Sequence, residues 1–214
     1  MAVGTAIFMA MTSIGIIDYG MGNLRSVWNA ISAVGGNPHL IESPSQVPNA
    51  SHVILPGVGA FGEAMRRLEG MGWIDALETH TLIHSRPFLG VCLGMQLLAD
   101  TGTEHGTHSG LGWIPGTATL LDPQNKSQIP HVGWNGVEVV RGDGLFRGIE
   151  SGKDFYFVHS YVLRPTDRSV VTSWCRHGEP FAASLHHNNI FATQFHPEKS
   201  QKNGLLLLEN FCQC

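Results

Sequence analysis

Apolar segments that alternate with helix-like segments constrain the fold of this chain more than any other feature. Such segments lie at 13–18, 51–57 and 87–92, and each is composed mainly of apolar residues. Between and after them, apolar residues recur at helical spacing, for example over 24–34. Continuous apolar strands separated by helices are typical of a parallel sheet that is covered on both faces. We therefore expect an α/β fold with a doubly wound, mostly parallel sheet and helices on both faces.

The second half of the chain has a different pattern. Short strand-like segments follow one another with only turn residues between them, at 136–140, 154–163, 170–175 and 181–185. This spacing predicts antiparallel strands and hairpins added to the parallel sheet. A further buried strand is expected over 190–195. The remaining helices are expected through 63–68 and over 73–84, 93–100 and 204–211.

A length of 214 residues suits a single domain, which we expect to span 13–214. Residues 1–12 are expected to form a flexible N-terminal extension and not a signal peptide, because their apolar run has no preceding Lys or Arg and continues into a strand. The net charge of −4 offers no basic surface for nucleic acid or membrane lipids. The four cysteines do not form a secreted disulfide pattern, so we expect a cytoplasmic protein.

The sharpest local signal is the sequence GVCLG at 90–94, which ends an apolar strand and begins a helix. It has the form of a nucleophile elbow with Cys92 in place of serine. Small residues are needed on both sides because a β-carbon there would collide with neighbouring backbone in so tight a turn. The turn places the thiol at a helix N-terminus, which favours a thiolate and leaves the N–H of Leu93 free to donate to an oxyanion. A buried structural cysteine remains the alternative unless a base is found.

A base and a carboxylate follow the strand expected at 190–195. Residues two apart in an extended chain project to the same side, so His196 and Glu198 are expected to meet, and Pro197 restricts the backbone between them. A carboxylate on one imidazole nitrogen leaves the other nitrogen free to take a proton from Cys92. Both segments follow apolar strands, so the side chains are expected at the same edge of the sheet.

Two segments, GVCLGMQLL (90–98) and QFHPEKS (194–200), resemble the triad, or class I, glutamine amidotransferases. Four more resemble the glutaminase subunits of imidazole glycerol phosphate synthase: DYGMGNLRSV (18–27), LPGVGAFGEAM (55–65), IPHVGWN (129–135) and YFVHSY (156–161). The resemblance covers nearly the whole chain from about Ser13. It implies that Cys92, His196 and Glu198 hydrolyse glutamine to glutamate and ammonia. We expect no cofactor, and no metal because the other histidines lack a Cys or carboxylate at compact spacing.

The resemblance also implies roles for further residues. The second half of the oxyanion hole would come from Gly57 and Val58, opposite Leu93, because glycines in this loop let a peptide group turn over. The implied substrate-binding residues are Gly59, Gln96, Ser160 and Tyr161.

A partner is implied as well, because a free glutaminase would waste its substrate. By resemblance this partner is the cyclase subunit, a (β/α)8 barrel that forms a heterodimer with the glutaminase and consumes the ammonia. The docking face would include Asn23, His131, Trp134, Asn135 and Lys199. A tryptophan is a frequent interface anchor, although the sequence alone fits a core position for Trp134 nearly as well.

Two alternatives remain at this point. The glutaminase of another ammonia-using synthase, such as pyridoxal phosphate synthase, would share the triad but not the sequence IPHVGWN. A non-catalytic α/β protein with an elbow cysteine, acting as a redox sensor or chaperone, would leave the arrangement of His196 and Glu198 without an explanation.

Overall fold

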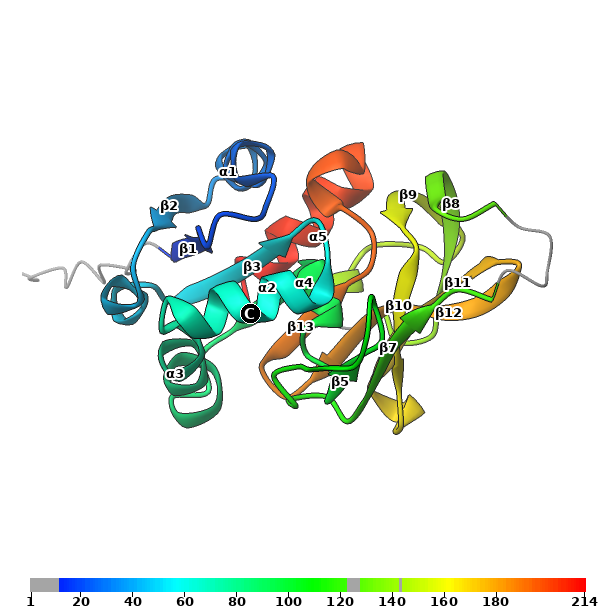
Figure 1. The fold of residues 1–214 in the computed structure, drawn as a ribbon. Helices are drawn as coiled ribbons and strands as arrows, with labels where there is room; N and C mark the ends of the chain where they lie inside the picture. The colour runs from blue at the N-terminus through cyan, green and yellow to red at the C-terminus, as the bar shows by residue number, and fades with distance from the viewer. Residues whose placement is uncertain (1–11, 123–127, 143) are drawn as a thin grey trace, which may run out of the picture.

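The computed structural model describes residues 12–122, 128–142 and 144–214 of the chain. The expected N-terminal extension falls almost entirely on 1–11, which lie outside the described residues. A nine-stranded sheet forms the centre of the fold, in the spatial order β2-β1-β3-β4-β13-β12-β11-β8-β9. Figure 1 shows this sheet running through the molecule between helices on both sides.

The parallel part of the sheet comes mainly from the first half of the chain. Its strands are β2 (Asn37–Ile41), β1 (Ser13–Ile17), β3 (His52–Gly57), β4 (Phe88–Cys92) and β13 (Ile190–Thr193). Each is parallel to the next in this order. Strand β2 was not predicted, because Pro38 interrupts its apolar pattern; a proline is tolerated there because β2 is an edge strand.

Helices cover both faces of this sheet, which confirms the doubly wound arrangement. They are α1 (Leu24–Ala33), α2 (Phe61–Gly70), α3 (Trp73–Glu78) and α5 (Gln201–Phe211), with a π-helical turn, Thr79–Ile83, after α3. In Figure 1, α1 and α5 lie above the sheet and α2 and α3 below it. Two separate apolar cores result, one containing Phe61 and Trp73 and the other containing Ile31 and Phe211.

The helix expected over 93–100 is much shorter than predicted, because α4 spans only Leu93–Gln96. The carbonyl groups of Leu97, Ala99 and Asp100 accept hydrogen bonds from the amides of 110–112 and so are not used in a longer helix. Gly110 permits this approach, because a β-carbon there would lie 2.1 Å from the Ala99 oxygen. The apolar pattern of 93–100 therefore reflects burial in a turn and not a continuous helix.

The predicted antiparallel additions are confirmed. Strands β12 (Glu179–His187), β11 (Val171–His177), β8 (His131–Val139) and β9 (Lys153–His159) continue the central sheet with antiparallel pairings. The strand expected over 154–163 divides at Ser160, where β10 (Tyr161–Pro165) enters a second sheet. That sheet contains β10, β7 (Gly116–Leu120), β5 (Thr101–Gly102) and β6 (His108–Ser109). No helix in the described part of the chain is long and apolar enough to cross a membrane.

Candidate active site

Cys92 ends β4 in the strained backbone conformation expected of a nucleophile elbow. Its φ is 56° and its ψ is −108°, a region that costs a residue with a side chain on the order of 1–3 kcal/mol. The flanking glycines make the turn possible: a β-carbon on Gly94 would lie 1.9 Å from the Leu55 oxygen, and one on Gly90 would lie 2.6 Å from the Gly94 oxygen. The elbow geometry predicted from GVCLG is therefore confirmed.

His196 and Glu198 meet, although not along a strand as expected. Strand β13 ends at Thr193, and the N–H of His196 donates to the Tyr156 oxygen at 2.9 Å. Residues Pro197–Lys199 then form a 3-10 turn, across which His196 Nδ1 lies 2.8 Å from Glu198 Oε1. Both side chains are buried, at 3% and 2% exposure, so the pair is shielded from water.

The electrostatics of His196 depend on its neighbours. Burial by itself disfavours the imidazolium, but the adjacent Cys92 and Glu198 outweigh this effect and raise the pKa of His196 to about 10. Its Nε2 atom has no hydrogen-bond partner among the described residues, and it lines the same pocket as Cys92. The site thus favours the protonated ring, the form that can donate a proton to a leaving group.

A pocket of about 250 Å³ opens beside Cys92 and His196. All the residues expected to bind substrate line it: Gly59, Gln96, Ser160 and Tyr161. Val58 and Leu93 line it as well. Gly57 is not among the lining residues; it is paired with Cys92 across β3 and β4, and a β-carbon there would lie 2.8 Å from the Leu93 Cβ. The volume is below the roughly 300–1,000 Å³ of pockets for drug-sized ligands and suits an amino acid.

The sequence analysis missed three residues that line the pocket, Glu104, Val158 and His159, and also the buried Gln194 next to Cys92. Glu104 lines the pocket from an irregular segment, and its Oε2 accepts a hydrogen bond from the Phe61 N–H at 2.8 Å. Gln194 is fully buried; its Nε2 donates to Cys92 Sγ at 3.7 Å and its Oε1 accepts from Gln96 Nε2 at 3.2 Å. The sequence around Glu104 has no pattern that indicates a functional site. A glutamine inside the otherwise apolar segment IFATQF, in contrast, could have indicated that Gln194 has a polar role in the interior.

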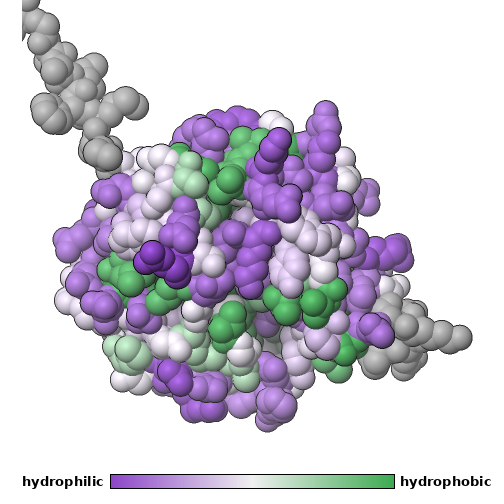
Figure 2. Space-filling model, turned by 90° about the horizontal axis from the view of Figure 1, so that it is seen from above, coloured by the Kyte–Doolittle hydropathy of each residue, from purple (hydrophilic) through white to green (hydrophobic). Residues whose placement is uncertain are grey.

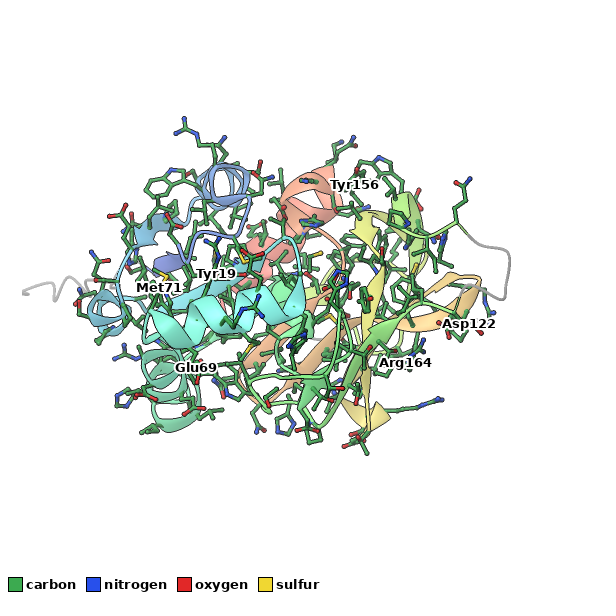
Figure 3. All side chains as sticks on the ribbon, in the orientation of Figure 1. Tyr19, Glu69, Met71, Asp122, Tyr156 and Arg164 are labelled. Atoms are coloured by element: carbon green, nitrogen blue, oxygen red, sulfur yellow. The ribbon has the colours of Figure 1, made fainter. Side chains whose placement is uncertain are left out.

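Tyr19 lies beneath the loop that carries Val58. Its ring is buried, at 1% exposure, and Figure 3 labels it in the interior of the fold. A β-carbon on Gly57 would lie 2.9 Å from the Tyr19 hydroxyl oxygen, so the hydroxyl occupies the space that a side chain would need. Burial, together with nearby Cys92, raises the pKa of Tyr19, which keeps the hydroxyl neutral beside the nucleophile.

An aromatic surface adjoins this pocket. Trp134 on β8 is 47% exposed, which excludes the core position that the sequence left open. Its ring meets the ring of Tyr156 edge-on at 5.9 Å, and Lys199 Nζ lies 5.8 Å from the centre of the Tyr156 ring. Because Lys199 also lines the pocket, the surface formed by Trp134, Tyr156 and Lys199 reaches the edge of the candidate active site.

The other residues expected on a docking face differ in position. Asn23, just before α1, and Asn135 on β8 are partly exposed. His131 is only 3% exposed and stacks on His177 and Phe157, with ring centres 4.1 Å and 4.8 Å away. The expectation that His131 lies on a docking face is therefore wrong: along β8 the side chains alternate, and His131 faces the core while Val132 is exposed.

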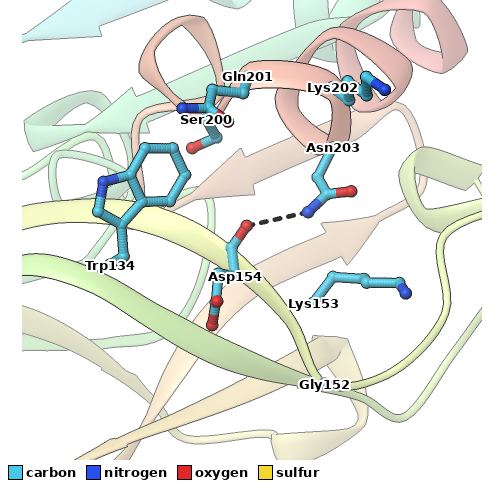
Figure 4. Close-up of a pocket in the computed structure, with 8 residues that line it drawn as sticks. All are labelled: Trp134, Gly152, Lys153, Asp154, Ser200, Gln201, Lys202 and Asn203. Carbon is cyan, nitrogen blue, oxygen red and sulfur yellow. Dashed lines mark hydrogen bonds between the residues drawn. The ribbon is translucent and has the colours of Figure 1, made fainter.

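A second and larger pocket, of about 510 Å³, lies on the flank of this surface. Figure 4 shows it between Trp134, Asp154 and the start of α5, where Asn203 Nδ2 donates to the Asp154 backbone oxygen at 3.1 Å. It shares no lining residue with the pocket that contains Cys92, and its Ser200 hydroxyl is engaged in hydrogen bonds with the His196 oxygen and the Tyr156 N–H. The smaller pocket is therefore the candidate active site.

Comparisons with known proteins agree with this geometry. Residues 15–213 match the family described as glutamine amidotransferase class-I. The chain is 44% identical over 200 residues to imidazole glycerol phosphate synthase subunit HisH 1 of Campylobacter jejuni subsp. jejuni serotype O:23/36 (strain 81-176), which covers 94% of this chain and 99% of that protein. It is 47% identical over 197 residues to imidazole glycerol phosphate synthase subunit HisH of Aquifex aeolicus (strain VF5), and the match covers 92% of this chain and 94% of that protein. In fold alone, PurLQS from Thermotoga maritima is similar, with a TM-score of 0.75 and 16% identity over 95% of this chain and 98% of that chain.

Proposed function

This chain belongs to the glutamine amidotransferase class-I family, and from that premise we propose that it is the glutaminase subunit of an imidazole glycerol phosphate synthase, in histidine biosynthesis. It hydrolyses glutamine to glutamate and ammonia. The observation that carries the proposal is one pocket in which an elbow cysteine, Cys92, adjoins a buried histidine, His196, bound to the carboxylate of Glu198. The similarity to HisH subunits over nearly the full chain supports the choice of synthase.

The reaction runs in two stages. Cys92 attacks the side-chain amide carbon of glutamine as a thiolate, and the negative oxygen that forms is held by the N–H of Leu93 and by the loop at 57–58. His196 donates a proton to the departing nitrogen, which leaves as ammonia and gives a thioester on Cys92. His196 then removes a proton from water, and the water oxygen attacks the thioester carbon; the carbon–sulfur bond breaks, glutamate is released, and the Cys92 thiolate and protonated His196 are restored. Glu198 orients His196 and stabilises its imidazolium.

Glutamine lies in the pocket with its amide at Cys92 and its amino-acid end among Gln96, Ser160 and Tyr161. The carboxylate of Glu104 supplies a negative charge that suits the ammonium group of a free amino acid. This assignment accounts for the small pocket, which has room for one amino acid and opens directly over the nucleophile.

The partner is a cyclase subunit, a (β/α)8 barrel that docks as a heterodimer over Trp134, Tyr156 and Lys199. A docked acceptor is chemically expected, because ammonia released into neutral water becomes mostly ammonium, which is not a nucleophile. Trp134 and Val132, at 47% and 57% exposure, give this surface apolar anchors. Figure 2 shows separate apolar patches within the hydrophilic face seen from above.

The described cysteines are all free, which suits a cytoplasmic enzyme.

Docking also provides a means of control. The loop at 56–59 contains Gly57 and Gly59, and Gly59 has a φ of +96°, so its peptide groups can occupy more than one orientation at small cost. Partner contacts that favour the orientation with an N–H aimed at the oxyanion would activate the site. A few kcal/mol of differential contact is enough to make a minor orientation dominant.

Glutamate release by the chain alone, with the cyclase subunit, and with the cyclase subunit plus an acceptor analogue tests this proposal. We expect slow release alone and faster release in each complex. Equal turnover in all three would show that the site is preformed without its partner. Absence of glutamate release in every case would exclude a glutaminase, and activation only by a pyridoxal phosphate synthase subunit would assign the chain to that complex.

A further inference from the structure

A chain of hydrogen bonds runs from β8 to the pocket and is not used by the reaction steps above. Asn135 Nδ2 lies 3.3 Å from His131 Nε2, and His131 Nδ1 lies 3.0 Å from His159 Nε2. His159 Nδ1 in turn lies 3.0 Å from the Tyr161 backbone oxygen. The same oxygen accepts a hydrogen bond from Gln96 Nε2 at 2.9 Å. The buried histidine on β8 is thereby linked to three residues that line the pocket, His159, Tyr161 and Gln96.

The direction of every bond in this chain can be deduced. A carbonyl oxygen only accepts, so His159 Nδ1 must carry a proton. Burial, with His131 close by, lowers the pKa of His159 to about 3, so the ring is neutral and its Nε2 accepts. His131 Nδ1 must then be the donor. Burial, with His177 stacked on it, lowers the pKa of His131 to about 4, so its Nε2 accepts from the Asn135 amide. Both rings are held in the Nδ1–H tautomer, and each donor points toward Tyr161.

The Tyr161 oxygen at the end of this chain and the neighbouring Gln194 fix the orientation of the Gln96 side-chain amide. Gln96 Nε2 uses its two hydrogens on the Tyr161 oxygen at 2.9 Å and on Gln194 Oε1 at 3.2 Å. Gln194 is oriented consistently, because its own Nε2 donates to Cys92 Sγ. A reversed Gln96 amide would point an oxygen at two acceptors, which is unfavourable for a buried group. Gln96 therefore presents Oε1, an acceptor, to the pocket.

We propose that His131 and His159 are positioning residues for glutamine: their one-way donor chain holds the Tyr161 peptide and the Gln96 amide so that an acceptor faces an N–H group of the substrate. This inference rests on the proposed glutaminase function and extends it to His131, which does not line the pocket. The competing explanation is that His131 only fills space, because its ring is buried and stacked on Phe157 and His177.

Two substitutions of His131 separate these explanations. His131→Phe keeps a flat ring in the stack but has no donor for His159. His131→Asn loses the ring but places an amide N–H near the position of Nδ1, where it can still donate to His159. In complex with the cyclase subunit, we expect the KM for glutamine to rise about tenfold for His131→Phe, the effect of one lost hydrogen bond to a buried acceptor. For His131→Asn we expect the KM for glutamine to rise less than about threefold. The kcat should be nearly unchanged in both variants.

The control is His80→Phe, which removes another buried histidine that does not line the pocket and should leave the KM unchanged. A KM that rises as much for His131→Asn as for His131→Phe would show that His131 acts by packing and would overturn the inference. A normal KM in both variants, confirmed to be folded by thermal unfolding, would also overturn it.

A second measurement is independent of glutaminase activity. Long-range ¹H–¹⁵N spectra of the wild-type chain with ¹⁵N-labelled histidine report the tautomer of each ring, and the His131→Asn spectrum assigns the His131 signals. We expect His131 and His159 to be neutral and protonated at Nδ1 at neutral pH. Protonation of either ring at Nε2 would contradict the donor chain even if glutamine hydrolysis is confirmed. Correct tautomers in a chain that does not hydrolyse glutamine would instead refute the proposed function.

Discussion

Replacing Glu198 by glutamine removes one charge from the site while keeping its shape. The carboxylate lies 2.8 Å from His196 Nδ1, and both side chains are almost fully buried, so water does not screen their interaction. A glutamine oxygen can still accept the hydrogen bond from Nδ1, but it no longer stabilises the imidazolium. We therefore expect a folded chain with a lower pKa of His196 and weaker catalysis.

The size of the effect follows from the charge. An opposite charge at this distance shifts a pKa by about 1–3 units, and each unit corresponds to about 1.4 kcal/mol, or a factor of ten in rate. Near the middle of this range, we expect kcat/KM for glutamine to fall about 100-fold in Glu198→Gln and the pKa of His196 to fall by about two units. Glutamate release in the complex gives the first quantity, and an NMR titration of His196 gives the second.

Glu209→Gln is the matched control, because it removes the same charge from an exposed position on α5 and should change neither quantity. The reasoning would be refuted if folded Glu198→Gln kept a kcat/KM within twofold of wild type with an unshifted His196 pKa.

Three further predictions concern the triad, the oxyanion loop and acid stability. His196→Ala should reduce glutamine hydrolysis nearly as much as loss of Cys92, because the triad acts as a unit; near-normal glutamate release would exclude the triad. Val58→Pro removes a peptide N–H and should lower kcat by about 10²–10³; unchanged kinetics at saturating glutamine would exclude an oxyanion role for the loop. The free energy of unfolding should decrease as the pH is lowered from 7 to 5. The pKa values of His131 (about 4) and His159 (about 3) in the folded chain lie below that of an unfolded histidine, so below about pH 6.5 the unfolded chain binds protons that the folded chain does not. Each histidine changes the free energy of unfolding by at most about 1.4 kcal/mol per pH unit. A midpoint of urea unfolding that stays constant over this range would contradict the view that His131 and His159 are neutral in the folded chain.

The parts of this fold that could be predicted from sequence are those that local chemistry determines. Apolar strands alternating with helices predicted the parallel sheet, and the glycines around Cys92 predicted its strained turn, because both depend on neighbours close in the chain. The approach of Glu198 to His196 was predicted from an extended backbone, whereas the contact is made across a 3-10 turn. A short separation in sequence was enough to bring the pair together even though the local conformation was misjudged.

The parts that could not be predicted depend on tertiary pairing. Helix α4 ends at Gln96 because a segment from 110–112 takes the carbonyl groups beyond it. Glu104 reaches the pocket from an irregular segment, which has no periodicity to interpret. His131 and Trp134 are three residues apart on one strand, so β-alternation places one in the core and the other on the surface, but only the strand register shows which is which.

Cys92→Ala tests whether glutamine hydrolysis and the use of ammonia are divided between the two subunits. Wild-type and Cys92→Ala chains are each assembled with the cyclase subunit, and formation of imidazole glycerol phosphate is measured with glutamine or with ammonium salts as the nitrogen source. We expect Cys92→Ala to abolish the glutamine-dependent reaction and to leave the ammonium-dependent reaction at the wild-type rate, because the elbow thiol serves only glutamine hydrolysis. Glutamine-dependent synthesis that survives in Cys92→Ala, or loss of the ammonium-dependent reaction in an intact complex, would contradict this division.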